Sequence, residues 1–127
     1  MATILIVDDE KPVRQFLVAA FQQEGHQVLE ASHGRQALNI LASGSAHPDI
    51  VISDLMMPLV GGAELCNILK SDPATAHIPV VLMSAAHPRS SATAMADALI
   101  SKPFDLDVLD SLVQRLLSLR TQRGGDR

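Results

Sequence analysis

The feature that most constrains this chain is a regular alternation of short apolar runs with longer amphipathic stretches. Strands that alternate with helical patterns are typical of a parallel sheet with crossover helices. The first, third and fourth runs are almost wholly apolar, as expected of strands that helices cover on both faces. We therefore predict an α/β fold with five strands, at residues 3–7, 27–31, 49–53, 79–83 and 99–101.

The stretches that follow the first three runs predict amphipathic helices. The second helix is predicted over residues 36–42, and the third begins near Gly62 with Leu65, Ile68 and Leu69 facing inward. The first helix begins near Pro12, ends before Gly25 and has one apolar face, made of Val13, Phe16, Leu17, Ala20 and Phe21.

Two further helices are predicted after the fourth and fifth runs. Residues 89–97 form the weaker one, because Ser and Thr are poor helix formers and the apolar stripe is thin. After Leu119 the chain is polar and contains two glycines, so residues 120–127 are predicted to be a flexible tail. The last helix has the clearest apolar face, made of Leu106, Leu109, Leu112, Val113, Leu116 and Leu117.

Composition excludes several classes of protein. A length of 127 residues predicts one domain, and the single cysteine, Cys66, excludes a disulfide framework and fits a reducing compartment. A net charge of −4 with 2% aromatic residues gives no indication of nucleic-acid binding. No apolar run is long enough to cross a membrane, and no secretory leader precedes the first strand, so we expect a cytoplasmic protein.

Acidic residues follow the first and third predicted strands. The first strand leads into Asp8, Asp9 and Glu10, and the third leads into Asp54. In an open parallel sheet, ligands bind at the carboxyl ends of the strands. If these two strands are neighbours, the carboxylates converge and repel one another unless a cation is bound. Oxygen ligands of this kind suit Mg²⁺, so we predict a Mg²⁺ site at this edge.

A hydroxyl and an ammonium group follow the last two strands. Ser84 comes after the fourth strand and Lys102 after the fifth. Beside a metal ion they would form a pocket for a tetrahedral dianion, since Ser84 can donate a hydrogen bond and Lys102 supplies positive charge. A carboxylate between the metal and the lysine can act as a nucleophile and form an acyl phosphate. Asp54 is the residue placed for that role.

With these residues the chain resembles the CheY-like receiver domain of two-component response regulators. The resemblance covers about residues 2–119 and implies a flavodoxin-like, doubly wound (βα)5 fold with a five-stranded parallel sheet in the order 2-1-3-4-5. Residues 1–119 would form the receiver domain, followed by the tail at 120–127. The matching segments are Asp8-Asp9-Glu10, Asp54-Leu-Met-Met57-Pro58 with Gly62 and Glu64-Leu65, Ser84-Ala85, and Lys102-Pro103-Phe104.

The resemblance also implies how a metal ion would be held. Asp9 and Asp54 would ligate Mg²⁺ directly, as would the backbone carbonyl of Met56. Asp8 would act largely through water.

The remaining implied roles concern the phosphoryl group. Asp54 would accept it from a partner histidine kinase or histidine phosphotransfer protein, Ser84 would move toward it, and Lys102 would pair with it. The bond from Lys102 to Pro103 would be cis, as is usual in the family. The domain would be a monomer or weak dimer that switches its binding to a downstream protein target. It would not be an enzyme beyond assisting its own phosphorylation and dephosphorylation.

Two departures from the family pattern fall on the face that most receivers use for output. Leu99 stands where the family normally has Tyr or Phe, three residues before Lys102. The segment from Ser84 to Lys102 is also about one helical turn, roughly four residues, shorter than the family pattern.

Two other functions share parts of this pattern. A phosphatase of the haloacid-dehalogenase type also uses an aspartate nucleophile and Mg²⁺. It needs Asp-x-Asp after the first strand and a capping insertion, whereas this chain has Asp8-Asp9-Glu10 and only 127 residues. The other alternative is a receiver-like interaction module, with a non-standard output face, that is never phosphorylated. The complete set of acids, hydroxyl and lysine argues against it.

Overall fold

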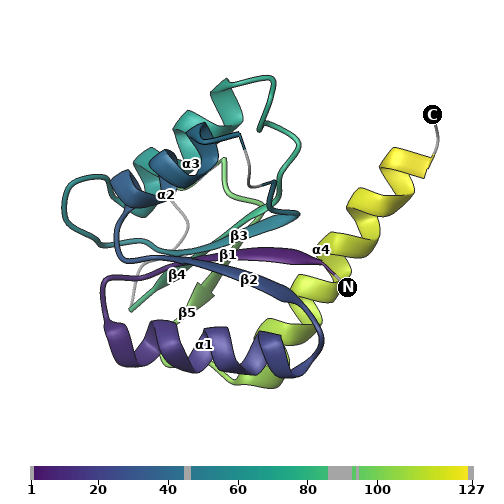
Figure 1. Cartoon of the computed structure of the whole chain (residues 1–127). Helices are drawn as coiled ribbons and strands as arrows, with labels where there is room; N and C mark the ends of the chain where they lie inside the picture. Colours follow the sequence, from purple (N-terminus) through teal and green to yellow (C-terminus); the bar gives the residue numbers. More distant parts are fainter. Residues whose placement is uncertain (1, 45–46, 86–92, 94, 126–127) are drawn as a thin grey trace.

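The computed structural model describes residues 2–44, 47–85, 93 and 95–125, with side chains to residue 119 (Figure 1). Its strands and helices alternate along the chain. In order they are β1 (Thr3–Val7), α1 (Lys11–Gln23), β2 (Gln27–Ala31), α2 (Gly34–Ala42), β3 (Ile50–Asp54), α3 (Gly62–Ser71), β4 (Val80–Ser84), β5 (Ala98–Ser101) and α4 (Leu106–Gly125).

The five strands form one parallel sheet in the order β2-β1-β3-β4-β5. This order confirms the predicted flavodoxin-like, doubly wound fold. Strands β1 and β3 are neighbours, and Val7 pairs with Ser53 near their carboxyl ends. The acidic residues that follow β1 therefore lie beside Asp54, the last residue of β3.

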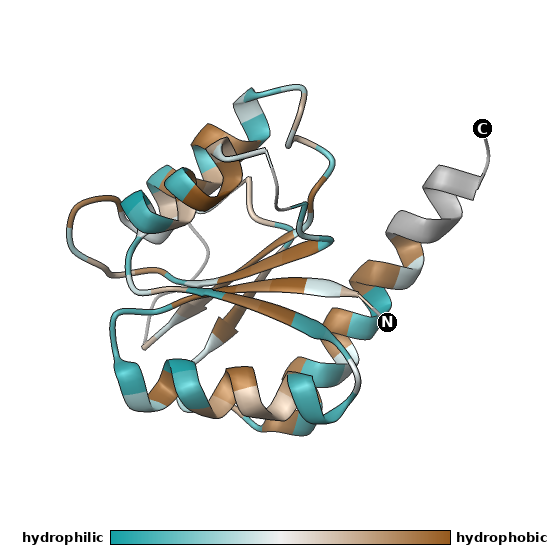
Figure 2. Cartoon of the chain, viewed as in Figure 1, coloured by the Kyte–Doolittle hydropathy of each residue, from teal (hydrophilic) through white to brown (hydrophobic). Residues whose placement is uncertain are grey.

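Helices cover both faces of the sheet, with α2 and α3 on one face and α1 and α4 on the other (Figure 1). Successive residues of a strand point to opposite faces. Leu5 and Val7 of β1 accordingly belong to the core beneath α2 and α3, while Ile4 and Ile6 pack on the side of α1 and α4. The central strands are hydrophobic along their length and lie between these helix layers (Figure 2).

The prediction of buried residues is wrong at one position in α1 and at one position in α3. Phe16 is 55% exposed and Ile68 is 40% exposed. Each lies about 100° around its helix from the middle of the buried stripe, because successive residues are about 100° apart. In α3 the inward place is taken by Cys66, which is buried between Leu65 and Leu69.

Some boundaries also differ from the prediction. Strands β3 and β4 each begin and end one residue later than predicted. They include Asp54 and Ser84, because Asp54 pairs with Met83 and Ser84 pairs with Ser101. Helix α4 continues to Gly125 beyond the predicted end at Leu119, since the first glycine comes only at position 124. The helix predicted over residues 89–97 lies largely outside the described residues.

None of the helices in the described part of the chain combines the length and the apolar character needed to span a bilayer.

Candidate functional site

Three carboxylates meet at the carboxyl ends of β1 and β3. Asp8 follows β1 and is fully buried, and Asp54 is 7% exposed. Glu10, at the start of α1, has a side chain that is 63% exposed. One carboxylate oxygen from each of these three residues lies within 4.8 Å of the others. At the edge of the sheet that was predicted to be acidic, three carboxylates therefore lie close enough together to bind one ion.

The ammonium group of Lys102 contacts all three carboxylates. Its Nζ lies 3.1 Å from Asp8 Oδ2, 3.3 Å from Asp54 Oδ1 and 3.4 Å from Glu10 Oε1. The backbone N–H of Lys102 donates to the carbonyl of Ser84 over 2.6 Å, and this bond ties the start of the lysine loop to the end of β4. The bond from Lys102 to Pro103 is cis, as predicted.

Burial and charge change the acid-base properties of this group. Burial, followed by the nearby charge of Asp8, raises the pKa of Asp54, and Lys102 offsets only part of this rise. Burial by itself would lower the pKa of Lys102, but the hydrogen bonds and charges of Asp8 and Asp54 together outweigh it, so the pKa of Lys102 is raised. One cation thus faces three carboxylates.

This charge balance fits a divalent cation. The donor atoms are all carboxylate oxygens, which suit Mg²⁺, and two of the three residues are buried. Positive charge from an ion would relieve the repulsion between Asp8 and Asp54. Asp8, Asp54 and Glu10 are the side chains that could hold such an ion.

The predicted metal ligands are only partly brought together. Asp9 is exposed and is not in the group of three, although its charge contributes to the raised pKa of Asp54. Glu10, which we did not predict as a ligand, lies in this group, and the role of Asp9 as a ligand stays a prediction. The side chain of Met56 lies on the loop after β3, where the residue is 68% exposed.

Ser84 is buried at the end of β4, next to β3 in the sheet. It lies one strand from Asp54, and its carbonyl is bonded to the backbone of Lys102. The hydroxyl and ammonium residues that sequence predicts for one pocket are therefore on adjoining segments.

A close backbone approach places α3 directly behind Asp54. Gly62 begins α3, and its N–H donates to the carbonyl of Leu55 over 2.9 Å. A Cβ at position 62 would overlap the carbonyl oxygen of Asp54, so only glycine fits here.

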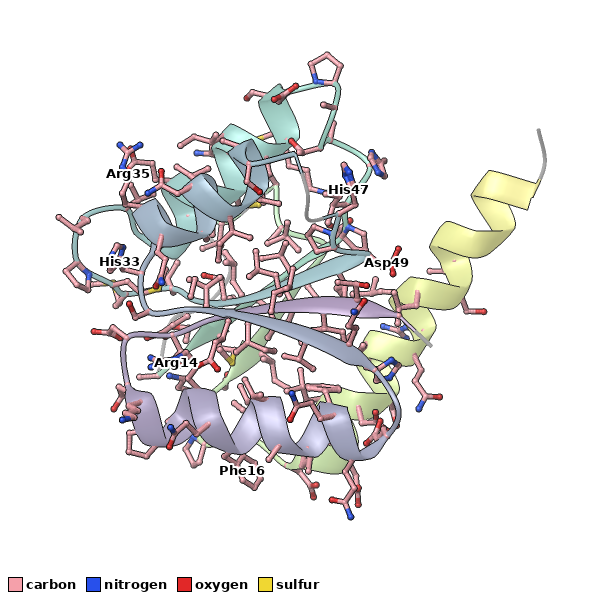
Figure 3. All side chains as sticks on the ribbon, viewed as in Figure 1. Arg14, Phe16, His33, Arg35, His47 and Asp49 are labelled. Atoms are coloured by element: carbon pink, nitrogen blue, oxygen red, sulfur yellow. The ribbon has the colours of Figure 1, made fainter. Side chains whose placement is uncertain are left out.

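Sequence reasoning missed Arg14. Its Nη1 donates to the backbone carbonyl of Asp8 over 2.8 Å, and its Nε donates to Glu30 Oε1 over 3.0 Å. Figure 3 shows Arg14 on the side of α1 that faces the sheet, opposite Phe16. Its position, six residues after Asp8 in the first turns of α1, was the only signal in the sequence.

Comparison with protein families shows the family of the chain. The family model for the response regulator receiver domain matches residues 4–114. The chain belongs to the response regulator receiver domain family. The match includes every acidic residue of the site, Ser84 and Lys102.

Relatives of this receiver domain come from several kinds of protein. It is 39% identical over 124 residues to the regulatory protein AtoC of Escherichia coli. The match covers 94% of this chain and 26% of that protein. It is 37% identical over 126 residues to histidine kinase P4 of Formosa agariphila, covering 94% of this chain and 9% of that protein. The receiver domain thus spans only a minor part of these curated relatives.

A solved receiver structure is also similar. The response regulator protein TrrA of Thermotoga maritima, in complex with Mg²⁺ and BeF, matches with a TM-score of 0.83 and 30% identity. The match covers 91% of this receiver domain and 99% of that chain.

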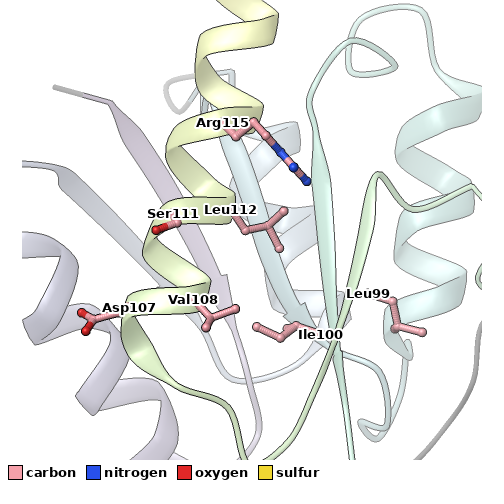
Figure 4. Close-up of a pocket in the computed structure, with 7 residues that line it drawn as sticks. All are labelled: Leu99, Ile100, Asp107, Val108, Ser111, Leu112 and Arg115. Carbon is pink, nitrogen blue, oxygen red and sulfur yellow. The ribbon is translucent and has the colours of Figure 1, made fainter.

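A groove lies beside Leu99, one of the two departures from the family pattern. Leu99 and Ile100 of β5 line it together with Val108, Leu112 and Arg115 of α4 (Figure 4), and its volume is about 560 Å³. With leucine at position 99, the two residues of β5 that line this groove, Leu99 and Ile100, are both aliphatic.

Proposed function

We propose that this receiver domain accepts a phosphoryl group on Asp54, with Mg²⁺ bound beside it. The observation that carries the proposal is the placement of the Asp54 carboxylate. It is nearly buried, is in contact with Lys102 Nζ at 3.3 Å, and lies in one group of oxygen ligands with Asp8. A nucleophilic carboxylate between a cation site and an ammonium group is suited to phosphoryl transfer.

In the proposed reaction, a carboxylate oxygen of Asp54 forms a bond to phosphorus. The bond from phosphorus to the donor's histidine nitrogen breaks, and its electron pair stays on that nitrogen. Bound Mg²⁺ would supply charge stabilisation to the transferring group. Lys102 would leave its carboxylate partners to pair with the phosphoryl oxygens, and Ser84 would donate a hydrogen bond to them.

The proposed phosphodonor is a histidine kinase or a histidine phosphotransfer protein. An apolar groove of about 590 Å³ borders Lys102 and is lined mainly by Pro12, Val13, Phe16, Pro103 and Phe104. The exposed ring of Phe16 at this groove supports docking of the donor protein there, because exposed aromatic residues beside a site often anchor partners. We also propose a cytoplasmic location and a downstream protein target that distinguishes the phosphorylated form.

Incubation with acetyl phosphate and Mg²⁺ tests this function directly. We expect the intact mass to rise by one phosphoryl group, and the Asp54→Asn variant not to gain it. Mass spectrometry is the suitable readout because the chain has neither Trp nor Tyr for fluorescence.

Asp107→Asn is the matched control, since Asp107 is an exposed aspartate on α4. It should be labelled like the wild type. A wild type that gains no mass would favour the unphosphorylated interaction module, and an Asp54→Asn variant that gains the same mass would exclude Asp54 as the acceptor.

A further inference from the structure

The guanidinium group of Arg14 links three elements at the edge of the site. It projects from α1, donates to the carbonyl of Asp8 after β1, and pairs with Glu30 of β2. The Arg14 side chain is only 13% exposed, whereas that of Glu30 is 50% exposed. Arg14 is thus held at one end by a surface carboxylate and directed at the backbone of a buried site residue.

The carbonyl that Arg14 binds lies just beyond the last paired residue of the β1–β2 ladder. The ladder ends where Val7 pairs with Ala31, and the N–H of Asp8 makes one more bond, to Ala31 O at 3.1 Å. The carbonyl of Asp8 comes after this bond. Because a buried carbonyl without a partner is costly, the bond from Arg14 also stabilises this end of β1.

The same carbonyl controls where the acidic residues point. It belongs to the peptide unit that joins Asp8 to Asp9, and the peptide unit is planar. One residue later, the N–H of Glu10 donates to Asp8 Oδ1 over 2.8 Å. The direction of the Asp8 carbonyl therefore sets the course of the backbone that carries Asp9 and Glu10 relative to the Asp8 carboxylate.

We propose that Arg14 is a positioning residue for cation binding: with Glu30 it holds the Asp8 peptide so that the carboxylates after β1 face Asp54. This inference rests on the proposed Mg²⁺-dependent function. It concerns residues that touch neither the phosphoryl group nor the cation. Partners of this kind, bonded to a ligand residue rather than to the metal, commonly tune metal affinity.

Charge and positioning have opposite effects here, which makes the role of Arg14 testable. A guanidinium group near several carboxylates repels a cation, so loss of Arg14 through its charge alone would tighten Mg²⁺ binding. Loss of a positioning bond would weaken it. Lysine at position 14 keeps the charge but lacks the planar fork that reaches two partners at once.

Calorimetric titration with Mg²⁺ alone, without a phosphodonor, separates these effects. We expect the Kd for Mg²⁺ to rise about tenfold in Arg14→Gln, the size typical for loss of a partner of a metal ligand. Arg14→Lys should also bind more weakly than the wild type, and Glu30→Gln should show a smaller rise. Arg35→Gln is the matched control, because Arg35 is exposed on α2 (Figure 3), and its Kd should not change.

Labelling by acetyl phosphate adds a kinetic readout. The Mg²⁺ concentration for half-maximal labelling should rise about tenfold in Arg14→Gln, while the rate at saturating Mg²⁺ stays within about twofold of the wild type. Circular dichroism monitors folding. If Arg14→Gln does not fold, Arg14→Lys and Glu30→Gln decide the question.

An unchanged or tighter Kd in the folded Arg14 variants overturns the inference. That result leaves the proposed function intact as long as the wild type binds Mg²⁺ and is labelled. A wild type that binds Mg²⁺ without being labelled refutes the proposed function but not the role of Arg14. A wild type that binds no Mg²⁺ refutes both.

Discussion

Strands β4 and β5 pair from Val81 and Ala98 to Ser84 and Ser101, yet they differ sharply in burial. All residues of β4 are buried, whereas β5 has three partly buried residues and an exposed last residue. Leu82 of β4 pairs directly with Leu99 of β5, so the two leucines share a face of the sheet. The difference comes from position, because β4 has a strand on each side and β5 is the edge of the sheet.

This contrast separates the site residues on buried interior strands from the departure from the family pattern on the edge strand. Asp54 and Ser84 end interior strands whose residues are all buried, so their positions are held from every side. Lys102 follows the edge strand and reaches the carboxylates from there. The departure from the family pattern at Leu99 falls on the edge, where a change of side chain disturbs fewer neighbours.

The largest expected effect is a difference between the paired leucines. Leu82→Ala should lower the free energy of unfolding by roughly 2–5 kcal/mol, because it leaves a cavity among fully buried residues. Leu99→Ala should cost only about 1 kcal/mol, since the side chain is partly exposed and can be replaced by solvent. Urea unfolding of both variants measures the difference.

Each substitution is the control for the other, because both replace a leucine on the same face of the sheet and differ only in the strand that carries it. Equal losses for Leu82→Ala and Leu99→Ala would contradict the contrast between interior and edge.

The next effect concerns the lysine that links the edge strand to the interior strands. In the absence of Mg²⁺, Lys102→Met should lower the free energy of unfolding by roughly 2 kcal/mol, because fully buried Asp8 loses its cationic partner. The loss should shrink when Mg²⁺ is added, since a bound cation compensates the carboxylates and stabilises the folded state. Thermal unfolding with and without Mg²⁺ tests both parts.

Lys11→Met is the control for the lysine, because Lys11 is exposed at the start of α1. It should be nearly neutral in both conditions. A loss in Lys102→Met that is the same with and without Mg²⁺ would mean that lysine and metal do not compensate the same charges.

A smaller effect is expected where the loop after β5 meets α1. Phe16→Ala should slow phosphoryl transfer from the cognate kinase about tenfold, because it removes an exposed aromatic side chain from the proposed docking groove. Labelling by acetyl phosphate should not change. Ile68→Ala, at a partly exposed position on α3, should leave both rates unchanged. A similar slowing with both donors would indicate damage to the site rather than to docking.

The smallest effect lies where α1 ends against α4. A hydrogen bond with Asp110, burial and the charges of Asp110 and Asp107 raise the pKa of Glu24 to about 7. An acid whose pKa is raised in the folded state is protonated there and ionised when unfolded, between its ordinary value and about 7. The folded state therefore loses stability as the pH rises through this range.

Glu24→Gln should remove this pH dependence. The wild type should lose roughly 1 kcal/mol relative to the variant between about pH 5 and pH 8, a modest loss because the Glu24 side chain is 35% exposed and screened by solvent. Thermal unfolding across the pH range measures the difference. A wild type and a variant with parallel pH profiles would refute the raised pKa of Glu24.

Much of the fold could be predicted from local pattern. The alternation of apolar runs and helical periods indicated all five strands, and the strand order agrees with the family resemblance. The placement of Asp8, Asp54 and Lys102 at one edge also followed from the sequence, because the carboxyl ends of parallel strands meet there. These features depend on periodicity and chain direction, which each segment carries by itself.

Tertiary structure alone decided which side chains meet at that edge. Three acidic residues follow β1 in the sequence, and only contacts with distant segments select Asp8 and Glu10 to lie beside Asp54 while Asp9 stays outside the group. Those contacts include the bonds of Asp8 to Ala31 and to Arg14. The direction of a backbone after it leaves a strand depends on such partners, and no local pattern encodes them.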